Sequence, residues 1–570
     1  MANRRVKLYR KNRAEETSHT GIHRAVVLMA YIYLALPMII FLLGWCRLLI
    51  GIPIAGICVW SLVLCYRGRE NYIELAWRLS PAEKWKIAVI AVVVFAWVAL
   101  SGVGGYAWQN TDHATRNSMF RILVDYEWPP AAETRGFVYY VGSWLPAALI
   151  GKLGDLDMAY AALFVWVLLG ILLIYALVCI WRRKIVLWPL LILIFFSGLD
   201  IIGSHIFTEE MISVWGKEHL EWWAAEFPYK LQYTSNTAQL YWVFNQAIPV
   251  WLVMMLLFLD EVPGNMIWVS AMLAITSTLP LIGLVPIMIY YMYRRFAWYT
   301  PESVGQGWKM VARGMGSFQN LAGGGTVLIV SFLYLMGNDS FTLVSVASAD
   351  RVSSRAANPA VWLPWLLLLI AFAAAVLVGT LIIWAAKWGK GYIIRNVLYV
   401  VAALVLINLF FKYLGGDRTS GNDVYRLAYT AVFLFIEAGI YLCLLFRDVE
   451  DKGLFHVVAV SLIAIPFITI GSSNDFCMRA SIPGLFVVML WCIDALGKRR
   501  LNLRIIVLMI CLVIGAVSPM HEIKRALVNS YEDYTMEYIE EERIFNAANF
   551  AGSLETFFWR FMARKTGAGV

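Results

Sequence analysis

Asp112 is the residue of this sequence best placed to do chemistry. It lies in the polar stretch Asn110-Thr111-Asp112-His113, which follows the apolar segment 87–108 and precedes an amphipathic segment that ends at Trp128-Pro129-Pro130. A carboxylate at a membrane surface can remove the proton of an attacking hydroxyl group, and partial burial tunes it to that task. We therefore expect Asp112 to be a catalytic acid or base, with His113 and Arg116 as its supporting, substrate-binding neighbours.

A leaving group with a phosphate would also require a cation to take up the developing charge. Three arginines in or near polar loops are candidates, namely Arg479 with Asp475 four residues before it, Arg426 in the stretch Asn422–Arg426, and Arg116 beside the acid. Of these, Arg479 is favoured. The expected substrate-binding residues are therefore His113, Arg116, Asp475, Arg479 and Arg426.

Structural roles explain the same residues equally well. An acid at the start of a helix commonly caps it, so Thr111 or Asp112 could serve only as a cap. Asp475 and Arg479 have the i, i+4 spacing of a helical surface ion pair, and Asp423 with Arg426 allows the same interpretation. Ionisable residues at the mouth of a membrane cavity are costly unless they are used, which keeps the functional interpretation open.

The elements that must position these residues lie in a membrane. The chain has 570 residues, of which 61% are hydrophobic and 15% charged, and its mean hydropathy is +0.68. Such a composition excludes a soluble domain. About fourteen apolar segments of spanning length begin near positions 25, 46, 87, 157, 185, 241, 266, 324, 359, 391, 427, 454, 483 and 503. The predicted fold is an all-α, polytopic helical bundle.

Orientation follows from the distribution of Lys and Arg. The amino terminus is expected to be cytoplasmic and retained, because it does not resemble a signal peptide. With this orientation, about 28 of the 47 Lys and Arg fall in segments on the inner side. The orientation requires that 266–293 crosses the membrane twice. Asp112 and the carboxyl terminus would then lie outside, in an inner (plasma) membrane protein. The net charge of +9 reflects this bias and gives no indication of nucleic-acid binding.

Three regions are expected along the chain. Residues 1–24 form a basic cytoplasmic tail, 25–520 the transmembrane domain with its outer loop 109–136, and 521–570 a small outer helical tail. Within the loop, apolar residues at i, i+3, i+4 and i+7 from Met119 predict a helix along the interface, with Arg116 and Asn117 off its apolar stripe. The segment 139–154 is short for a span and predicts a juxtamembrane or re-entrant helix.

Other polar residues have weaker indications. His205, Glu209 and Glu210 match no metal motif and favour a solvated helix face, and Trp222 and Trp223 suit an aromatic belt as well as a sugar platform. Asn245 and Gln246 are expected to bond neighbouring helices or to line a polar cavity. The eight cysteines favour no disulfide or zinc framework. The sequence indicates no cofactor, and no ligand spacing supports a divalent metal.

The order of motifs over residues 87–181 resembles the GT-C superfamily of membrane glycosyltransferases. The shared features are an acid in the first large outer loop, an interfacial helix, a proline stop, a short helix that contains Tyr139-Tyr140, and the ending Lys152-Leu153-Gly154. The resemblance implies that Asp112 binds or deprotonates the acceptor, and that the donor is a polyprenyl-phosphate-linked sugar. Two spans before the loop, the flank Asp112-His113 and the small tail depart from the better-known subfamilies.

The expected function is transfer of a sugar from a lipid-linked donor to a cell-envelope glycan or lipid acceptor at the outer face. The partners would be that donor, that acceptor and membrane lipids. One alternative is a transporter or flippase of a lipid-linked glycan, although no internal repeat supports it. Another is a polysaccharide polymerase or ligase, for which His521, near Lys524 and Arg525, would gain weight.

Overall fold

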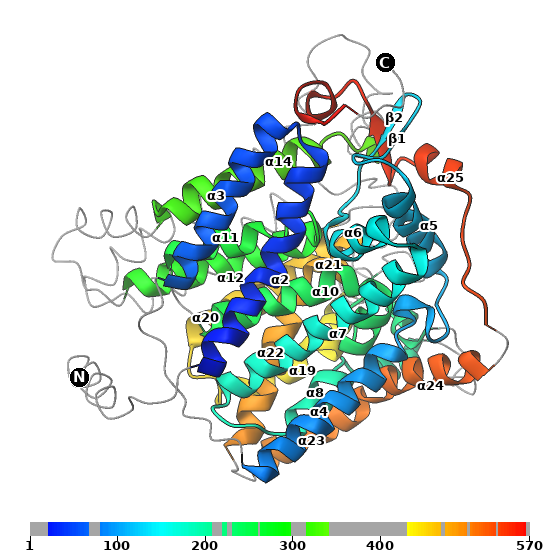
Figure 1. Cartoon of the computed structure of the whole chain (residues 1–570). Coiled ribbons are helices and arrows are strands. Elements are labelled where there is room, and N and C mark those ends of the chain that lie inside the picture. Colours follow the sequence, from blue (N-terminus) through cyan, green and yellow to red (C-terminus); the bar gives the residue numbers. More distant parts are fainter. Residues whose placement is uncertain are drawn as a thin grey trace, which may run out of the picture.

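A computed structural model describes residues 21–67, 80–207, 219–224, 231–259, 263–297, 315–340, 430–468, 474–498, 502–531 and 534–565. These ranges form a helical bundle with one small sheet at its edge (Figure 1). The helical membrane bundle predicted from composition is confirmed, while the sheet was not expected.

The helices of the first half of the chain are α2 (Gly21–Trp45), α3 (Leu48–Arg67), α4 (Pro81–Ala99), α5 (Asp112–Asp125), α6 (Leu145–Leu153), α7 (Leu156–Trp181), α8 (Trp188–Phe195), α9 (Asp200–Phe207), α10 (Asn236–Leu259), α11 (Pro263–Ala271) and α12 (Thr278–Ala297). Those that follow are α14 (Thr326–Leu335), α19 (Ile440–Leu445), α20 (Lys452–Ala464), α21 (Asp475–Ala480), α22 (Ile482–Gly497), α23 (Leu503–Gly515), α24 (Val517–Tyr531) and α25 (Glu541–Asn546). Short π-helical segments precede α14 and α19, at Gln319–Gly325 and Phe435–Gly439.

Seven helical stretches of the described residues are long and apolar enough to cross a membrane. They are Arg24–Trp45, Leu48–Arg67, Leu156–Trp181, Trp188–His205, Asn236–Leu259, Asp475–Gly497 and Leu503–Tyr531. The chain is therefore a multi-pass membrane protein. The count of fourteen stays a prediction, because the spans expected near 359 and 391 lie outside the described residues.

Helix ends that the sequence assigns to one face of the membrane meet in the structure. Arg182 at the end of α7 pairs with Asp494 of α22 at 2.9 Å, and Lys498 pairs with the same carboxylate at 2.9 Å. Arg504, which begins α23, pairs with Asp448 after α19 at 3.1 Å. We call this the basic end of the bundle. Which compartment it faces stays a prediction.

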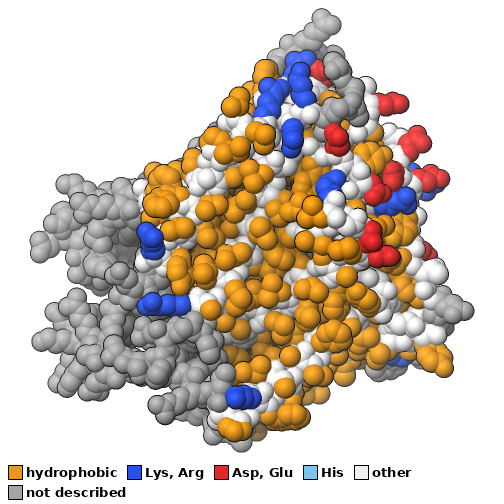
Figure 2. Space-filling model, viewed as in Figure 1, with side chains coloured by type: hydrophobic (Ala, Val, Ile, Leu, Met, Phe, Trp, Pro, Cys, Tyr) orange, Lys and Arg blue, Asp and Glu red, His pale blue; other side chains and the backbone are white. Residues whose placement is uncertain are grey.

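The opposite end, which we call the loop end, carries α5, α6, α25 and the sheet (Figure 1). On the face shown in Figure 2, hydrophobic side chains cover the middle of the bundle, and Asp and Glu gather along the edge where α5 and α25 lie. The predicted outer loop 109–136 and the carboxyl-terminal tail thus share one end, as the sequence analysis requires.

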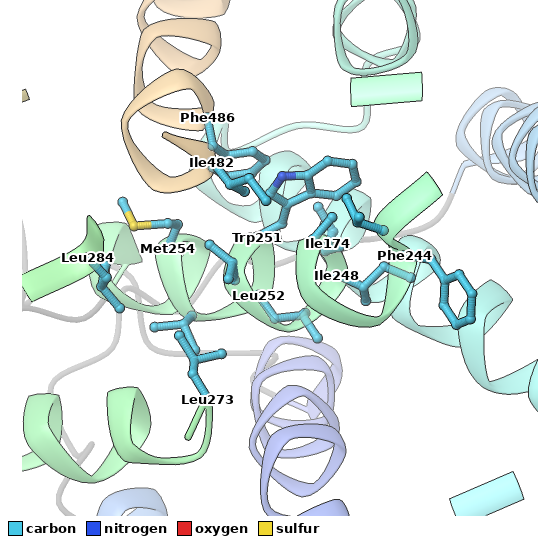
Figure 3. Packing of buried hydrophobic residues seen from close by; sticks show 14 of the residues in the cluster. Ile174, Phe244, Ile248, Trp251, Leu252, Met254, Leu273, Leu284, Ile482 and Phe486 are labelled. Carbon is cyan, nitrogen blue, oxygen red and sulfur yellow. The ribbon is translucent and has the colours of Figure 1, made fainter. Parts of the chain in front are cut away.

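The core of the bundle is built around α10. Its residues pack against α7, α12 and α22 on different sides, and Trp251 stacks on Phe486 with ring centroids 5.9 Å apart (Figure 3). Nearly every residue from Asn236 to Leu257 is buried. A helix that is apolar all round in this way can lie only inside a larger bundle.

α10 is broken near its loop end. Val243 has non-helical backbone angles (φ −142°, ψ 37°), and Pro249 lacks the N–H that would bond the carbonyl of Asn245. Side chains from elsewhere satisfy the carbonyls near the break: Ser143 donates to Asn245 O, and Ser277 donates to Gln246 O at 2.9 Å. Irregular backbone at membrane depth is tolerated only when protein covers it in this manner.

The predicted crossings of 266–293 are two helices of unequal length. α11 has nine residues, about 14 Å at the usual rise, and the chain turns at 272–277 before α12. The turn reaches the loop end, where Gly142 N donates to Ile275 O at 2.9 Å. Near its other end, α12 returns to the basic end, since Tyr290 bonds Asp451 there.

The carboxyl-terminal segment differs from the prediction. Residues 534–540 have no regular secondary structure, although a charged helix was expected there. Helix α24 also continues past residue 520, where a domain boundary was expected. The segment then forms α25 and β3 (Ala551–Ser553), which pairs with β2 (Arg135–Phe137); β2 also pairs with β1 (Ala131–Ala132), both antiparallel. The tail therefore packs against the loop that contains Asp112.

A close approach of α12 to α21 gives a steric prediction. A Cβ at Gly283 would lie 1.9 Å from the backbone oxygen of Ala480, which cannot move aside easily. We expect Gly283→Ala to destabilise the protein by about 1–3 kcal/mol and to displace α21. Gly56→Ala is the matched control, because a Cβ there meets no atom within 4 Å. Thermal denaturation in detergent checks this, and equal midpoints for the two variants would contradict it.

Candidate functional site

The start of α5 is fixed by Asn110. Its Oδ1 accepts the backbone N–H of Asp112 at 3.1 Å, its carbonyl accepts that of His113 at 2.9 Å, and its Nδ2 donates to Tyr241 O of α10 at 2.9 Å. The prediction that Thr111 or Asp112 caps this helix is wrong, since Thr111 makes no side-chain cap and Asn110 supplies the acceptor. The Asp112 carboxylate is therefore not used as a cap.

Asp112 and Arg116 form an ion pair on the first turn of α5. Arg116 Nη2 lies 2.7 Å from Asp112 Oδ2. The acid side chain is 48% exposed and the arginine side chain only 10%. Arg116 Nη1 is buried and has no hydrogen-bond partner among the described residues. The pair therefore presents an accessible carboxylate and a buried donor with unused capacity.

A second pair of the same type lies at the start of α21. Arg479 Nη2 is 3.4 Å from Asp475 Oδ1, and the two side chains are 13% and 42% exposed. Arg479 Nη1 donates to the Tyr140 hydroxyl at 2.6 Å, and the Tyr139 hydroxyl donates to the same oxygen. Arg479 Nε is buried and has no acceptor within the described ranges.

The two pairs belong to one site. The Asp112 carboxylate is close enough to Arg479 to interact with it electrostatically. Arg116 and Arg479 are both close enough to Tyr139 to interact with its hydroxyl in the same way. Burial, with the neighbouring Tyr140, raises the pKa of Tyr139 well above its ordinary value, so its phenol stays neutral. Asp112, Arg116, Asp475 and Arg479 thus lie at the same end of the bundle, and their role in substrate binding or catalysis stays a prediction. Arg426 and its neighbour Asp423 lie outside the described residues.

His113 faces the bundle. Its Nε2 lies 3.1 Å from Tyr241 O, so this nitrogen carries the proton that the carbonyl accepts. Burial, and then the charge of Arg116, lower the pKa of His113 from 6.5 to about 3. The ring is therefore neutral near pH 7 and anchors α5 to α10. A substrate-binding role for His113 stays a prediction.

A cavity lies behind α5 and reaches Arg116. The residues that line it are Val103, Gly104, Gln109, His113, Arg116, Asn117, Phe120, Trp144, Tyr160, Leu163 and Phe244. The cavity has room for about one water molecule and is too small for a sugar, so it is not a substrate pocket.

The surface of α5 is more covered than the sequence predicts. Arg116 and Asn117 are buried, although both lie off the apolar stripe. The carboxyl-terminal tail covers Asn117 and its neighbour: Asn117 Nδ2 donates to Glu537 O at 3.0 Å, and Ser118 Oγ donates to Ile539 O at 2.8 Å. Arg116 instead pairs with Asp112 and borders the cavity behind α5. Contacts between residues some 420 positions apart leave no local pattern, so they could not be predicted from the sequence.

The loop around Trp223 is also different from expectation. Trp223 is buried and its Nε1 donates to Glu437 Oε1 at 3.0 Å, which fits neither an aromatic belt nor a sugar platform. His219 and Glu221 are buried as well. His205 is exposed, and Glu209 and Glu210 lie outside the described residues.

Comparisons add no relative to this picture. No protein-family model, no curated protein and no solved structure matches the chain. Among the described residues, no three His, Cys, Asp or Glu side chains are arranged to hold a metal ion. The function must therefore be argued from the site itself.

The buried His113 gives a pH prediction. Between pH 6.5 and about 3 the denatured chain binds a proton at this position that the folded protein does not. The stabilisation is thus complete above pH 6.5 and is lost as pH falls, by about 1.4 kcal/mol per pH unit. We expect His113→Gln to show a shallower loss of thermal stability from pH 6.5 to 4.5 than wild type.

The exposed His205 provides the control. His205→Gln should keep the wild-type pH dependence, because the exposed His205 ring stays in contact with solvent in the folded protein. Identical pH dependences for wild type and His113→Gln would show that His113 takes up protons in the folded protein.

Proposed function

We propose that the chain is a membrane glycosyltransferase that moves a sugar from a polyprenyl-phosphate-linked donor to a glycan or lipid acceptor at the outer face. One observation carries the proposal: a half-exposed acid, Asp112, lies in one site with two largely buried arginines, Arg116 and Arg479, that retain unused N–H donors. The resemblance to the GT-C superfamily supports the same assignment of the acid.

Each group has a role in the proposed reaction. Asp112 accepts the proton of the acceptor hydroxyl as its oxygen bonds to the anomeric carbon, and the bond between that carbon and the phosphate oxygen breaks with inversion. The leaving phosphate takes the electron pair, and Arg479 and Arg116 donate hydrogen bonds to it. Tyr140 holds the Arg479 guanidinium in orientation.

The neighbouring surface suits a lipid donor. α6 packs beside α5 and exposes Ile150 and Leu153, 40% and 81% accessible, at the same end of the bundle. An isoprenoid chain in the bilayer can lie against such side chains while its phosphate reaches the arginines. A soluble donor has no lipid chain that could be buried against these exposed apolar side chains.

A transporter or flippase of a lipid-linked glycan is the second candidate. Two observations favour it: the helix between Trp188 and Phe207 is interrupted at residues 196–199, and α10 is broken at Val243. Discontinuous helices form the substrate sites of many transporters. The effect of Asp112→Asn on surface glycans distinguishes transport from sugar transfer.

The proposed base gives the sharpest prediction. We expect Asp112→Asn to lower product formation by about 10²- to 10⁴-fold without a large loss of stability, because the amide keeps the shape and still accepts a hydrogen bond from Arg116. Asp125→Asn, at the exposed far end of α5, should leave activity unchanged.

The measurement is mass spectrometry of surface glycans and glycolipids in a deletion strain complemented with each variant. Loss of one sugar in the deletion and in Asp112→Asn supports transfer. A deletion that changes glycan structure while Asp112→Asn restores it fully would remove Asp112 from the chemistry. Unaltered glycans that reach the surface more slowly would favour transport.

The proposed phosphate ligand can be tested by binding. We expect Arg479→Gln to weaken the binding of polyprenyl monophosphate by roughly 10- to 150-fold, the effect of losing about 1.5–3 kcal/mol from a charged hydrogen bond. Arg121→Gln is the matched control, since Arg121 on α5 is half exposed and pairs with Asp125. Equal dissociation constants for the two variants in lipid nanodiscs would contradict the role of Arg479.

A further inference from the structure

Three carboxyl groups lie together inside the bundle, apart from the Asp112 site. Asp200 begins α9, Glu221 is in the helical turn Leu220–Ala224, and Glu437 is in the π-helical segment before α19. Each is only 1% exposed. Glu437 belongs to an apolar helix, Thr430–Leu445, and Asp200 to the candidate span Trp188–His205. Carboxyl groups in such surroundings are expensive and are usually functional.

Each carboxyl has neutral hydrogen-bond donors. Asp200 Oδ2 accepts from the hydroxyls of Ser197 and Ser518, both at 2.8 Å. Glu221 Oε1 accepts from the backbone N–H of Ser235 at 3.0 Å, and Glu437 Oε1 accepts from Trp223 Nε1. Their arrangement is therefore specific, and the donors come from segments far apart in the chain.

Two oxygens of the cluster have no donor at all. Asp200 Oδ1 and Glu437 Oε2 are both buried without a partner among the described residues. Glu437 Oε2 lies directly against Gly198, where a Cβ would be only 1.7 Å away, and the two carboxyl groups are within hydrogen-bond reach of each other. Two carboxylate oxygens can approach in this way only if one of them carries a proton.

No cation neutralises the cluster within the described part of the chain, where none of the three carboxyls has an ion pair with Lys or Arg. Glu522 of α24, which lies nearby, is different: Arg525 donates to it at 2.9 Å and Trp242 Nε1 at 2.9 Å, and His219 lies 3.5 Å away. Three uncompensated buried carboxylates would cost far more than such a bundle can offset.

We propose that Asp200, Glu221 and Glu437 form a proton-binding site, in which Glu437 and Glu221 each hold a proton and Asp200 is the carboxylate that accepts the hydrogen bond from Glu437. The site is separate from the proposed transferase chemistry and does not depend on it. A reversible proton site within a membrane bundle is what a proton-coupled step of this protein would use.

The surroundings favour the protonated forms. Burial, and then the charges of Asp200 and Glu522, raise the pKa of Glu221 well above its usual value. The other titratable groups that interact with the cluster or its nearest neighbours are His219, Tyr233, Tyr441, Cys477, His521 and Arg525. The guanidinium of Arg525 is bonded to Glu522.

Infrared spectroscopy of the purified full chain in lipid nanodiscs tests the proposal. At neutral pH the wild type should show the carbonyl stretching band of protonated carboxylic acids. Glu437→Gln and Glu221→Gln should each remove about half of the band, and the double variant should abolish it. Asp200→Asn should shift the band without removing it, and Glu522→Gln should leave it unchanged because Glu522 is paired with Arg525.

Labelling provides a readout that needs no variant. Incorporation of ¹³C-glutamate should shift the whole band in the wild type, even if a substitution fails to fold. Absence of the band at neutral pH, or a band that neither the label nor the double variant affects, would overturn the proposal. So would a band that appears only when Na⁺ or K⁺ is removed, since a metal cation would then be the occupant.

Discussion

The loop end depends on the carbonyl groups that the broken helix α10 leaves free. Tyr241 O accepts from Asn110 and lies 3.1 Å from His113 Nε2, Asn245 O accepts from Ser143, and Gln246 O accepts from Ser277. A buried carbonyl without a donor costs roughly 1–3 kcal/mol, and water is scarce at this depth. The same groups that would destabilise α10 therefore bind the loop 109–144 and the turn 272–277 to the bundle.

This anchoring explains how a membrane-surface loop can hold charged groups in fixed positions. Asn110 and His113 fix the first turn of α5, and with it the Asp112–Arg116 pair. Ser143 fixes the segment that follows Tyr140, whose hydroxyl meets Arg479 on α21. Catalytic and binding groups work best on rigid supports, and here each support ends on the backbone of one central helix.

Local pattern in the sequence was sufficient for the apolar helices, but not for their partners or for the small sheet. Apolar segments predicted the membrane helices, and i, i+4 spacing allowed the pairing of Asp475 with Arg479, because spans and such pairs are local features. The short helix expected over 139–154 begins only at Leu145. The burial of Asn117 was missed, because Glu537, whose carbonyl it bonds, is 420 positions away. Pro249 indicates that the carbonyl of Asn245 lacks its helical donor, because proline has no N–H. No local sequence pattern, however, identifies Ser143 as the donor that replaces it.

The two ionisable sites differ in a way that follows from solvent access. At the loop end the acids are half exposed and each arginine keeps spare donors, an arrangement suited to an anion that arrives from outside. Inside the bundle, Asp200, Glu221 and Glu437 lie together without an ion pair to Lys or Arg among the described residues, an arrangement suited to binding protons. Tyr241 contacts His113 of the first site and the adjacent Trp242 bonds Glu522 beside the second, so one turn of α10 is shared by both. A movement of that turn would therefore change the positions of side chains at both sites.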